Sequence, residues 1–210
     1  MVALFAKRNF AVGITFKKTE ILQAALVGFV VLDDRISGAG LGAILLGFVG
    51  VGVLSLKRLS DFSFENKAAL LGLLAGALFA LSAVAYRGAL LQLSSDSAFM
   101  RALITLSVVT ASQTIAVTAW LACFQPGQIA TALRAWRAGV VIGLAGMGGS
   151  IAWFAAFALQ NAAYVFAVGQ VEVIFLILAG RIVFGEHLSR REIVAIALVT
   201  SSVLALVLSA

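Results

Sequence analysis

The sequence predicts an all-α integral membrane protein, a bundle of about seven transmembrane helices that contains an inverted-topology repeat. Apolar residues make up 62% of the 210 residues, and charged residues make up only 11%. Soluble domains usually contain roughly 45–50% apolar and about 25% charged residues. The mean hydropathy is +1.11. A soluble fold of this length would lack the polar groups needed to cover its surface, so the expected surrounding is the lipid bilayer.

Seven apolar segments are candidate membrane spans, because a helix needs about 20 apolar residues to cross a bilayer core of about 30 Å. They cover residues 19–34, 38–56, 67–93, 98–123, 138–160, 164–184 and 191–209. The first segment is short and begins with polar residues. Outer-membrane strands alternate apolar and polar residues, whereas residues 41–56 are apolar on all sides. Helices are therefore predicted, since they satisfy their own backbone groups in lipid.

The connections between these segments are short, and none is long enough to separate soluble domains. Residues 125–137 form the longest one, which could lie along the membrane interface. The net charge of +6 comes from Lys and Arg residues that are scattered among the loops rather than gathered in a patch. This scatter favours orientation in a bilayer over nucleic-acid binding. The expected location is the cell membrane, or the inner membrane of a Gram-negative cell, with several passes.

An internal repeat becomes visible when the chain is shifted along itself by 152 positions. Residues 17–56 then align with residues 169–208 without a gap. Apolar matches are frequent by chance in so apolar a chain, but acidic residues are rare, and Glu20 aligns with Glu172. Further matches are Gly28 with Gly180, Ser37 with Ser189, Ala43 with Ala195 and Leu54 with Leu206.

The spacing of the two copies dictates their direction in the membrane. The span at 164–184 follows the span at 19–34 by five crossings, an odd number, so the two copies cross in opposite directions. An inverted-topology repeat of this kind is the plan of many secondary transporters, whose two halves rock about a central site. The alternative is a gene duplication without transport.

Two stretches carry a family resemblance. In the second copy, Val171-Glu172-Val173-Ile174 leads through Phe184-Gly185-Glu186-His187-Leu188-Ser189 into the last helix. In the first copy, Thr19-Glu20-Ile21 leads to Leu32-Asp33-Asp34-Arg35-Ile36-Ser37. Both stretches resemble the drug/metabolite transporter superfamily, specifically its EamA-type permeases. That family shows an acidic residue, often followed by Pro, then an apolar helix that ends in Leu-Gly-Glu and a Ser/Thr turn.

The resemblance implies a division of the chain into two domains. EamA-type permeases have ten helices in two homologous halves of five. Residues 1–66 match the C-terminal part of the first EamA-like repeat, and residues 67–210 match a complete second repeat. The resemblance therefore implies that the first three of ten helices are missing from this sequence. Ile21 and Val173 stand where the family often has Pro, so the expected helix break is softer here.

Glu20 and Glu172 are the leading candidates for substrate binding. An acidic group inside a membrane costs about 2.5–3.5 kcal/mol on insertion scales, and such groups usually face a cavity or a partner. By resemblance, both helices line the central cavity, where a carboxylate could bind a cation or carry a coupling proton. The alternative is an interfacial acid at a helix start, stabilised by the helix dipole. Lys17 and Lys18 beside Glu20 favour this alternative for the first copy.

Four further residues are candidate contacts for the substrate. Gln113 lies in the middle of a span and Gln170 lies two residues before Glu172. A buried amide requires hydrogen-bond partners, which are either the substrate or neighbouring helices. Trp153, on a segment that lines the cavity by resemblance, could stack together with Tyr164 on a flat or cationic ligand. The alternative for such aromatic residues is anchoring at the membrane interface.

Other kinds of chemistry are not supported. Cys123 is the only cysteine, so no intrachain disulfide and no cysteine metal cluster is possible. His187 has no ligand partner at suitable spacing, and no Walker, Gly-x-Ser-x-Gly or His-Glu-x-x-His motif occurs. We therefore expect no enzyme activity, no cofactor and no metal. Small residues recur four apart in three rows, which are Gly72, Gly76 and Ala80; Gly38 and Gly42; and Gly139 and Gly143. Such rows predict close helix packing.

Together these observations predict a secondary active transporter that moves a small metabolite or drug-like molecule by alternating access. Because the sequence contains no ATP-binding loop, an ion or substrate gradient would drive it. Its expected partners are the lipid bilayer and the small-molecule substrate, a homodimer is compatible with such a bundle, and nucleic acid is excluded. The alternative is a non-transporting partial bundle that needs a partner chain, or an inactive truncated remnant.

Overall fold

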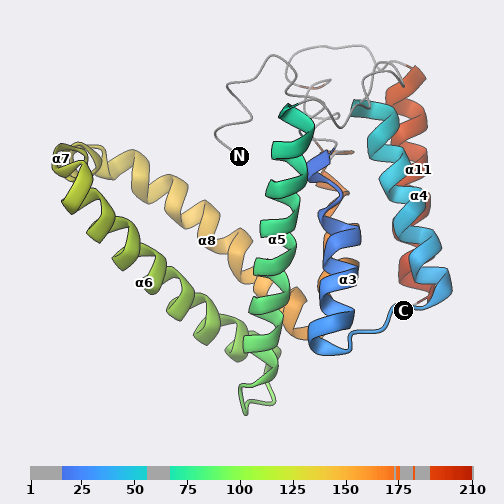
Figure 1. Ribbon diagram of the computed structural model, residues 1–210, viewed down its shortest axis with the longest axis horizontal. Coiled ribbons are helices and arrows are strands. Elements are labelled where there is room, and N and C mark those ends of the chain that lie inside the picture. Colours follow the sequence, from blue (N-terminus) through green and yellow to red (C-terminus); the bar gives the residue numbers. More distant parts are fainter. Residues whose placement is uncertain (1–15, 56–66, 173, 176–181, 183–189, 210) are drawn as a thin grey trace. The chain divides into compact units, whose positions relative to one another are not determined.

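The computed structural model describes residues 16–55, 67–172, 174–175, 182 and 190–209 (Figure 1). Every regular element in these ranges is an α-helix, as the composition predicts. The helices are α3 (Glu20–Leu32), α4 (Gly38–Ser55), α5 (Lys67–Leu91), α6 (Ala98–Phe124), α7 (Pro126–Arg134), α8 (Trp136–Leu159), α9 (Ala162–Gly169) and α11 (Arg190–Ser209).

Among the described residues, three helices are long and apolar enough to cross a membrane. They are Leu70–Leu91, Ala98–Phe124 and Trp136–Leu159. Three shorter apolar helices, Glu20–Leu32, Gly38–Val53 and Ile193–Leu208, fall on further predicted spans. The 13 residues of α3 rise only about 20 Å, which is less than the bilayer core, because a break in the helix precedes Glu20.

Two boundaries differ from the sequence prediction. The segment 125–137 contains a helix, α7, and α8 begins immediately afterwards at Trp136. Pro126 stands at the start of α7, where its fixed φ suits a helix and its missing N–H breaks no hydrogen bond. The predicted span at 164–184 begins as α9 but is interrupted after Gly169, and most of its remainder lies outside the described residues.

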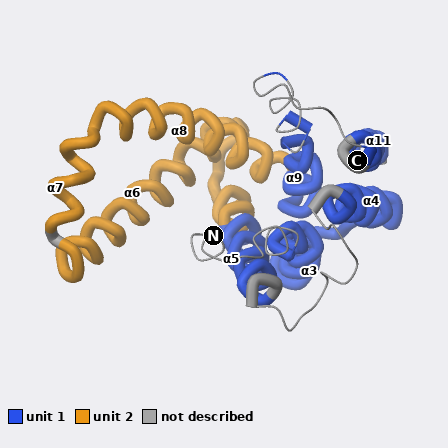
Figure 2. Tube along the Cα trace, turned by 90° about the horizontal axis from the view of Figure 1, so that it is seen from above, with its two compact units in different colours: residues 1–85, 161–210 blue, residues 86–160 orange. Residues whose placement is uncertain are grey.

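The chain divides into two compact units (Figure 2). Unit 1 contains residues 1–85 and 161–210, and unit 2 contains residues 86–160. Unit 1 therefore holds both copies of the repeat, residues 17–56 and 169–208, although they come from opposite ends of the sequence.

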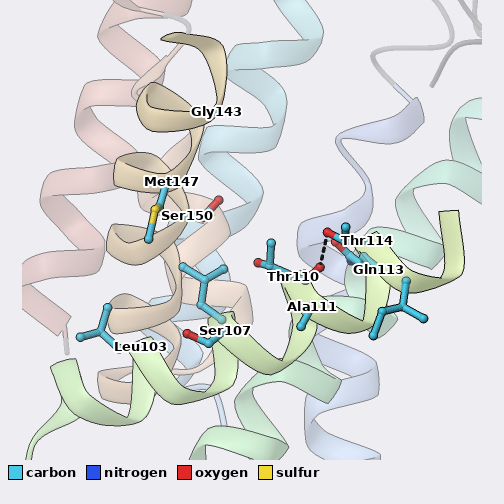
Figure 3. A pocket seen from close by; sticks show the side chains of 11 residues that line it. Leu103, Ser107, Thr110, Ala111, Gln113, Thr114, Gly143, Met147 and Ser150 are labelled. Carbon is cyan, nitrogen blue, oxygen red and sulfur yellow. Dashed lines mark hydrogen bonds between the residues drawn. The ribbon is translucent and has the colours of Figure 1, made fainter. Parts of the chain in front are cut away.

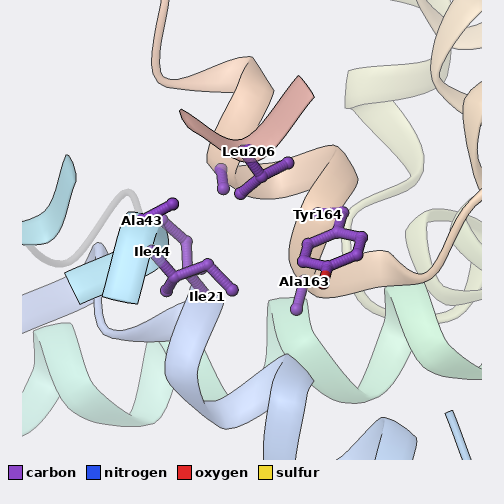
Figure 4. Packing of buried hydrophobic residues seen from close by; sticks show 7 residues of the cluster. Ile21, Ala43, Ile44, Ala163, Tyr164 and Leu206 are labelled. Carbon is purple, nitrogen blue, oxygen red and sulfur yellow. The ribbon is translucent and has the colours of Figure 1, made fainter. Parts of the chain in front are cut away.

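The core of unit 1 joins four helices through small and branched apolar side chains (Figure 4). Ile21 of α3, Ile44 of α4, Tyr164 of α9 and Leu206 of α11 meet there with the alanines at positions 43, 163 and 167. All seven are buried. In lipid, close van der Waals packing of this kind holds helices together, so the cluster fastens one repeat copy to the other.

The helices α4 and α11 are equivalent in the repeat, and they lie side by side and antiparallel (Figure 1). A Cβ atom on Gly47 would lie 2.6 Å from Ser202 Oγ, and one on Gly50 would lie 3.1 Å from Val199 Cγ2. Glycine at these two positions lets the two backbones approach. The shift of 152 residues carries Gly47 to Val199 and Gly50 to Ser202, so the two close contacts map onto each other.

A hydrogen bond between α4 and α11 also has an equivalent contact under the 152-residue shift. The Ser202 hydroxyl donates to the carbonyl oxygen of Ala43 at 2.6 Å. The shift maps this contact onto Gly50 and Ala195, and the Ala195 carbonyl oxygen lies 3.3 Å from the Cβ position of Gly50. Reciprocal contacts are the signature of a two-fold axis. α4 and α11 are thus related by a pseudo-two-fold axis, as an inverted repeat requires.

Of the three predicted rows of small residues, the row on α5 packs closely. Its members Gly72, Gly76 and Ala80 are buried, and a Cβ on Gly76 would lie 2.8 Å from the carbonyl oxygen of Lys17. This row seats α5 against the start of α3. The rows at 38 and 42 and at 139 and 143 are wrong, because no described atom lies within 4 Å of their Cβ positions.

Unit 2 consists of α6, α7 and α8 together with the end of α5. Arg87 of α5 donates two hydrogen bonds of 2.8 Å, to the carbonyl oxygens of Phe157 and Gln160. These carbonyls belong to the C-terminal end of α8, where the helix dipole favours a cation. Arg87 therefore fastens the end of α5 to the end of α8.

Candidate functional site: paired charges at two helix breaks

Both copies of the repeat contain a helix break at the same place. In the first copy, a turn at residues 18–19 precedes α3, which begins at Glu20. In the second copy, a turn at residues 170–171 follows α9, and helical structure resumes at Glu172. The shift of 152 residues carries one turn onto the other. Neither turn contains Pro, yet both helices are interrupted.

The backbone hydrogen bonds repeat across the two breaks. The N–H of Thr19 donates to the carbonyl of Phe16 at 3.2 Å, and the equivalent Val171 donates to Val168 at 3.1 Å. A second equivalent pair of bonds, from the N–H of residue 23 to the carbonyl of residue 19 and from that of residue 175 to residue 171, measures 3.0 and 3.4 Å. Each break places a glutamate at the first residue of the new helical segment, where the helix dipole stabilises a negative charge. Transporters place discontinuous helices of this kind at their binding sites.

Glu20 is buried and held by its neighbour Lys17. The Lys17 Nζ atom lies 2.7 Å from Glu20 Oε1 and 2.6 Å from Glu20 Oε2. The Glu20 side chain is only 5% exposed and the Lys17 side chain 14%. Lys17 Nζ also lies 4.3 Å from the centre of the Phe79 ring on α5, where a cation interacts favourably with the aromatic face. Glu20 therefore combines burial with a fixed counter-charge.

Glu172 is held from the other copy of the repeat. Lys18 Nζ donates to Glu172 Oε1 and forms an ion pair with it across 154 residues of sequence. The Lys18 side chain is 11% exposed, whereas the Glu172 side chain is 55% exposed. Because Lys17 and Lys18 are neighbours in the sequence, Glu20 and Glu172 are held by adjacent residues. The structure therefore brings together the two glutamates that the sequence singled out, with one lysine on each.

Gln170 is the most deeply buried polar side chain at these breaks. It is 1% exposed, and neither atom of its amide has a hydrogen-bond partner among the described residues. Its Oε1 lies 3.3 Å from the Cβ position of Gly47 on α4. A buried amide without partners costs free energy that a folded protein normally avoids. Gln170 thus retains hydrogen-bonding capacity inside unit 1.

Tyr164 lies in the core of unit 1, where its ring fills the cluster of Figure 4. Its hydroxyl lies 3.3 Å from Ser37 Oγ and accepts a weak hydrogen bond of 3.4 Å from the Ser37 backbone N–H. A Cβ on Gly40 would lie 2.1 Å from the same hydroxyl. The environment of Tyr164 is therefore that of a packed core residue, and its stacking on a ligand stays a prediction.

The predicted residues of unit 2 lie apart from each other. Gln113 lines a cavity of about 760 Å³ between α6 and α8 (Figure 3). It also donates a weak hydrogen bond of 3.5 Å to the Tyr86 hydroxyl. Trp153 is not part of that lining, and its ring lies 5.8 Å from the ring of Phe157. The other polar groups of the cavity are hydroxyls, at Ser107, Thr110, Thr114 and Ser150.

The sequence reasoning missed two features of these sites. It read Lys17 and Lys18 as neighbours of one glutamate, whereas they hold two different ones. The alignment of the two copies contained a hint of this difference. Lys18 aligns with Gln170, so the break of the second copy has no lysine at that position. The hydroxyls of the cavity were also missed, although Ser107, Thr110 and Thr114 recur at three- and four-residue spacing on one face of α6.

Comparison with protein families identifies the family to which the chain belongs. The model of the EamA-like transporter family matches residues 66–208, which is more than half of the chain. The chain belongs to the EamA-like transporter family. No curated protein matches it significantly. The EamA-like chain is accordingly a multi-pass membrane protein of a transporter family, and a lipid bilayer and a small-molecule substrate are the partners that this membership implies.

Proposed function

We propose that this EamA-like protein is a secondary active transporter that carries a small metabolite or drug-like molecule by alternating access. The family membership supports transport. The mechanism is supported by the pair of equivalent helix breaks, each of which is followed directly by a glutamate. Two inverted copies that share one contact surface can exchange their conformations, which exposes a central site to each side of the membrane in turn. An ion or substrate gradient would supply the free energy.

In this proposal, residues 1–66 are the C-terminal part of one EamA-like repeat and residues 67–210 are a complete second repeat. Glu172 is the residue on which transport depends most. It is the more exposed of the two glutamates and it has one lysine partner that comes from the other copy. Glu20 and Gln170 lie at the same breaks, and Gln113, Trp153 and Tyr164 complete the set of substrate contacts that we propose.

The test is uptake into proteoliposomes that contain the purified protein. A mixture of amino acids, nucleobases and small organic cations is supplied under a proton or sodium gradient, and mass spectrometry identifies what accumulates. We expect Glu172→Gln to reduce uptake at least about tenfold while the protein stays monodisperse. The matched control is Asp33→Asn, which makes the analogous acid-to-amide change at an exposed acid whose ion-pair partner among the described residues is Arg35, at 3.4 Å.

Three outcomes are informative. Uptake by the wild type that Glu172→Gln abolishes and Asp33→Asn preserves supports the proposal. Equal uptake by wild type and Glu172→Gln removes Glu172 from the mechanism. No uptake of any compound by the wild type, under either gradient, favours the alternative of a partial bundle that needs a partner chain.

A further inference from the structure

The two helix breaks are equivalent in backbone but not in side chains. The shift of 152 residues carries Lys17 to Gly169 and Lys18 to Gln170. Both lysines therefore belong to the first copy, and the second copy has no cation at its break. Glu20 has a counter-charge from its own copy, whereas among the described residues Glu172 is paired with Lys18 of the other copy.

The pseudo-two-fold axis gives the Lys18–Glu172 contact a mirror image. The repeat maps Lys18 to Gln170 and Glu172 to Glu20, so the mirror contact joins Gln170 to Glu20. That contact is not formed here: neither amide atom of Gln170 has a partner among the described residues, and Glu20 is held by Lys17. The reciprocal contacts of α4 and α11 are both present, by comparison. The side chains at the two helix breaks therefore do not follow the pseudo-two-fold symmetry that relates α4 and α11.

We infer that the Lys18–Glu172 ion pair is a conformational latch whose mirror contact, Gln170–Glu20, forms in the opposite-facing state. The inference rests on the proposed alternating access, in which the two copies exchange conformations. In the state of this structure, Lys18 holds Glu172 and the Gln170 amide has no partner. In the opposite state, the Gln170 amide donates to the Glu20 carboxylate, and Lys18 releases Glu172.

Two observations favour this exchange over a fixed structural ion pair. The Gln170 side chain is 1% exposed, and a buried amide is retained at such a position when it gains a partner in some state of the protein. The ion pair is also only partly enclosed, because the Glu172 side chain is 55% exposed whereas the Lys18 side chain is 11% exposed, so Glu172 itself is not stranded in a buried site when the pair opens. When it opens, the break of the second copy has no lysine of its own, so a cation from solution or from the substrate can take the place of Lys18 beside Glu172.

The test links pairs of cysteines with a short homobifunctional methanethiosulfonate reagent in reconstituted membranes. The background is Cys123→Ser, which removes the only native cysteine. One pair, Lys18→Cys with Glu172→Cys, reports the contact seen here. The second pair, Glu20→Cys with Gln170→Cys, reports the mirror contact. The control pair is Ala43→Cys with Ser202→Cys, because those residues touch beside the axis and should link in both states.

We expect both reporter pairs to link. We further expect Lys18→Met, added to the mirror pair, to raise its linking rate about two- to fivefold, which is what the loss of a partly exposed ion pair allows. Lys18→Arg keeps the charge and should leave the rate near that of the parent. Lys17→Met is the matched control, because Lys17 has lost its partner in the Glu20→Cys background and belongs to no mirror contact. If the Glu20→Cys pair is not monodisperse, Gln23→Cys with Gln170→Cys replaces it, one turn along α3.

A mirror pair that does not link while the control pair links fully would overturn the latch. A mirror pair that links at a rate independent of Lys18 would do the same. Uptake measured in the same proteoliposomes separates this outcome from failure of the proposed function. Active uptake without mirror linking removes the latch alone, whereas linking that responds to Lys18 without any uptake removes the transport proposal and leaves the conformational exchange.

Discussion

Replacing Gly47 with alanine should loosen the contact between the two repeat copies. The new Cβ would lie 2.6 Å from Ser202 Oγ, 3.2 Å from Ser202 Cβ and 3.3 Å from Gln170 Oε1. The Ser202 hydroxyl cannot turn away freely, because it donates a 2.6 Å hydrogen bond to the carbonyl of Ala43. Either this hydrogen bond breaks or α4 and α11 move apart.

The magnitude follows from three contributions. Overpacking a close contact costs about 1–3 kcal/mol, and an interhelical hydrogen bond in a membrane protein averages about 0.6 kcal/mol. The change from Gly to Ala within a helix returns about 0.8–1 kcal/mol. The net loss is about 0.5–3 kcal/mol, which lowers the melting temperature by about 1–12 °C for a chain of this length.

The assay is thermal unfolding in detergent, followed by the loss of the monodisperse peak. The control is Gly42→Ala on the same helix, where no described atom lies within 4 Å of the Cβ position. That variant gains helix propensity without a clash and should be unchanged or slightly more stable. If Gly47→Ala proves as stable as Gly42→Ala, the close approach of α4 and α11 does not exist in the membrane protein.

The other predictions concern the breaks and the core of unit 1. Lys17→Met should destabilise the protein by about 3–5 kcal/mol, because it strands a glutamate that is only 5% exposed. Lys18→Met should cost at most about 1 kcal/mol, since Glu172 is 55% exposed. Equal melting temperatures for Lys17→Met and Lys18→Met would contradict this difference between the two ion pairs. Gly40→Ala places a Cβ 2.1 Å from the Tyr164 hydroxyl and 2.8 Å from its ring, so it should lower the melting temperature more than Tyr164→Phe, which loses only the contact with Ser37. A smaller loss for Gly40→Ala would show that the tyrosine ring can leave the core.

Much of the fold follows from the sequence because lipid imposes simple rules. Apolar segments must be helices, and a repeat separated by an odd number of crossings must be inverted. The shift of 152 residues identified α4 and α11 as equivalent segments, and their first residues, Gly38 and Arg190, differ by that number. Glu20 and Glu172 were identifiable because acids are rare in this chain. Their side-chain surroundings were not, since they depend on where segments 154 residues apart come to lie.

The faces of the helices were harder to predict than their positions. Glycines occur on every side of α4, at residues 38, 40, 42, 47, 50 and 52, so a spacing of four could not select the face that meets α11. The choice depends on tertiary packing, which favours Gly47 and Gly50. The helix α7 was missed for a local reason, because Pro126 and Gly127 together are typical of a loop, whereas Pro also occupies the first position of many helices.

The difference between the two ion pairs bears on how a nearly symmetric transporter can work. Two identical inverted copies would populate both states equally, so any bias must come from residues that differ between them. A buried pair such as Lys17–Glu20, with a breaking cost of about 3–5 kcal/mol, would hold more than 99% of the molecules in one state if it had to open in each cycle. The Lys18–Glu172 pair is partly exposed, because the Glu172 side chain is 55% exposed, and a partly exposed pair changes the ratio of states only about one- to fivefold. Such a pair biases the equilibrium and still permits turnover. We therefore expect the pair that joins the two copies to open during transport, while the pair within one copy stays closed.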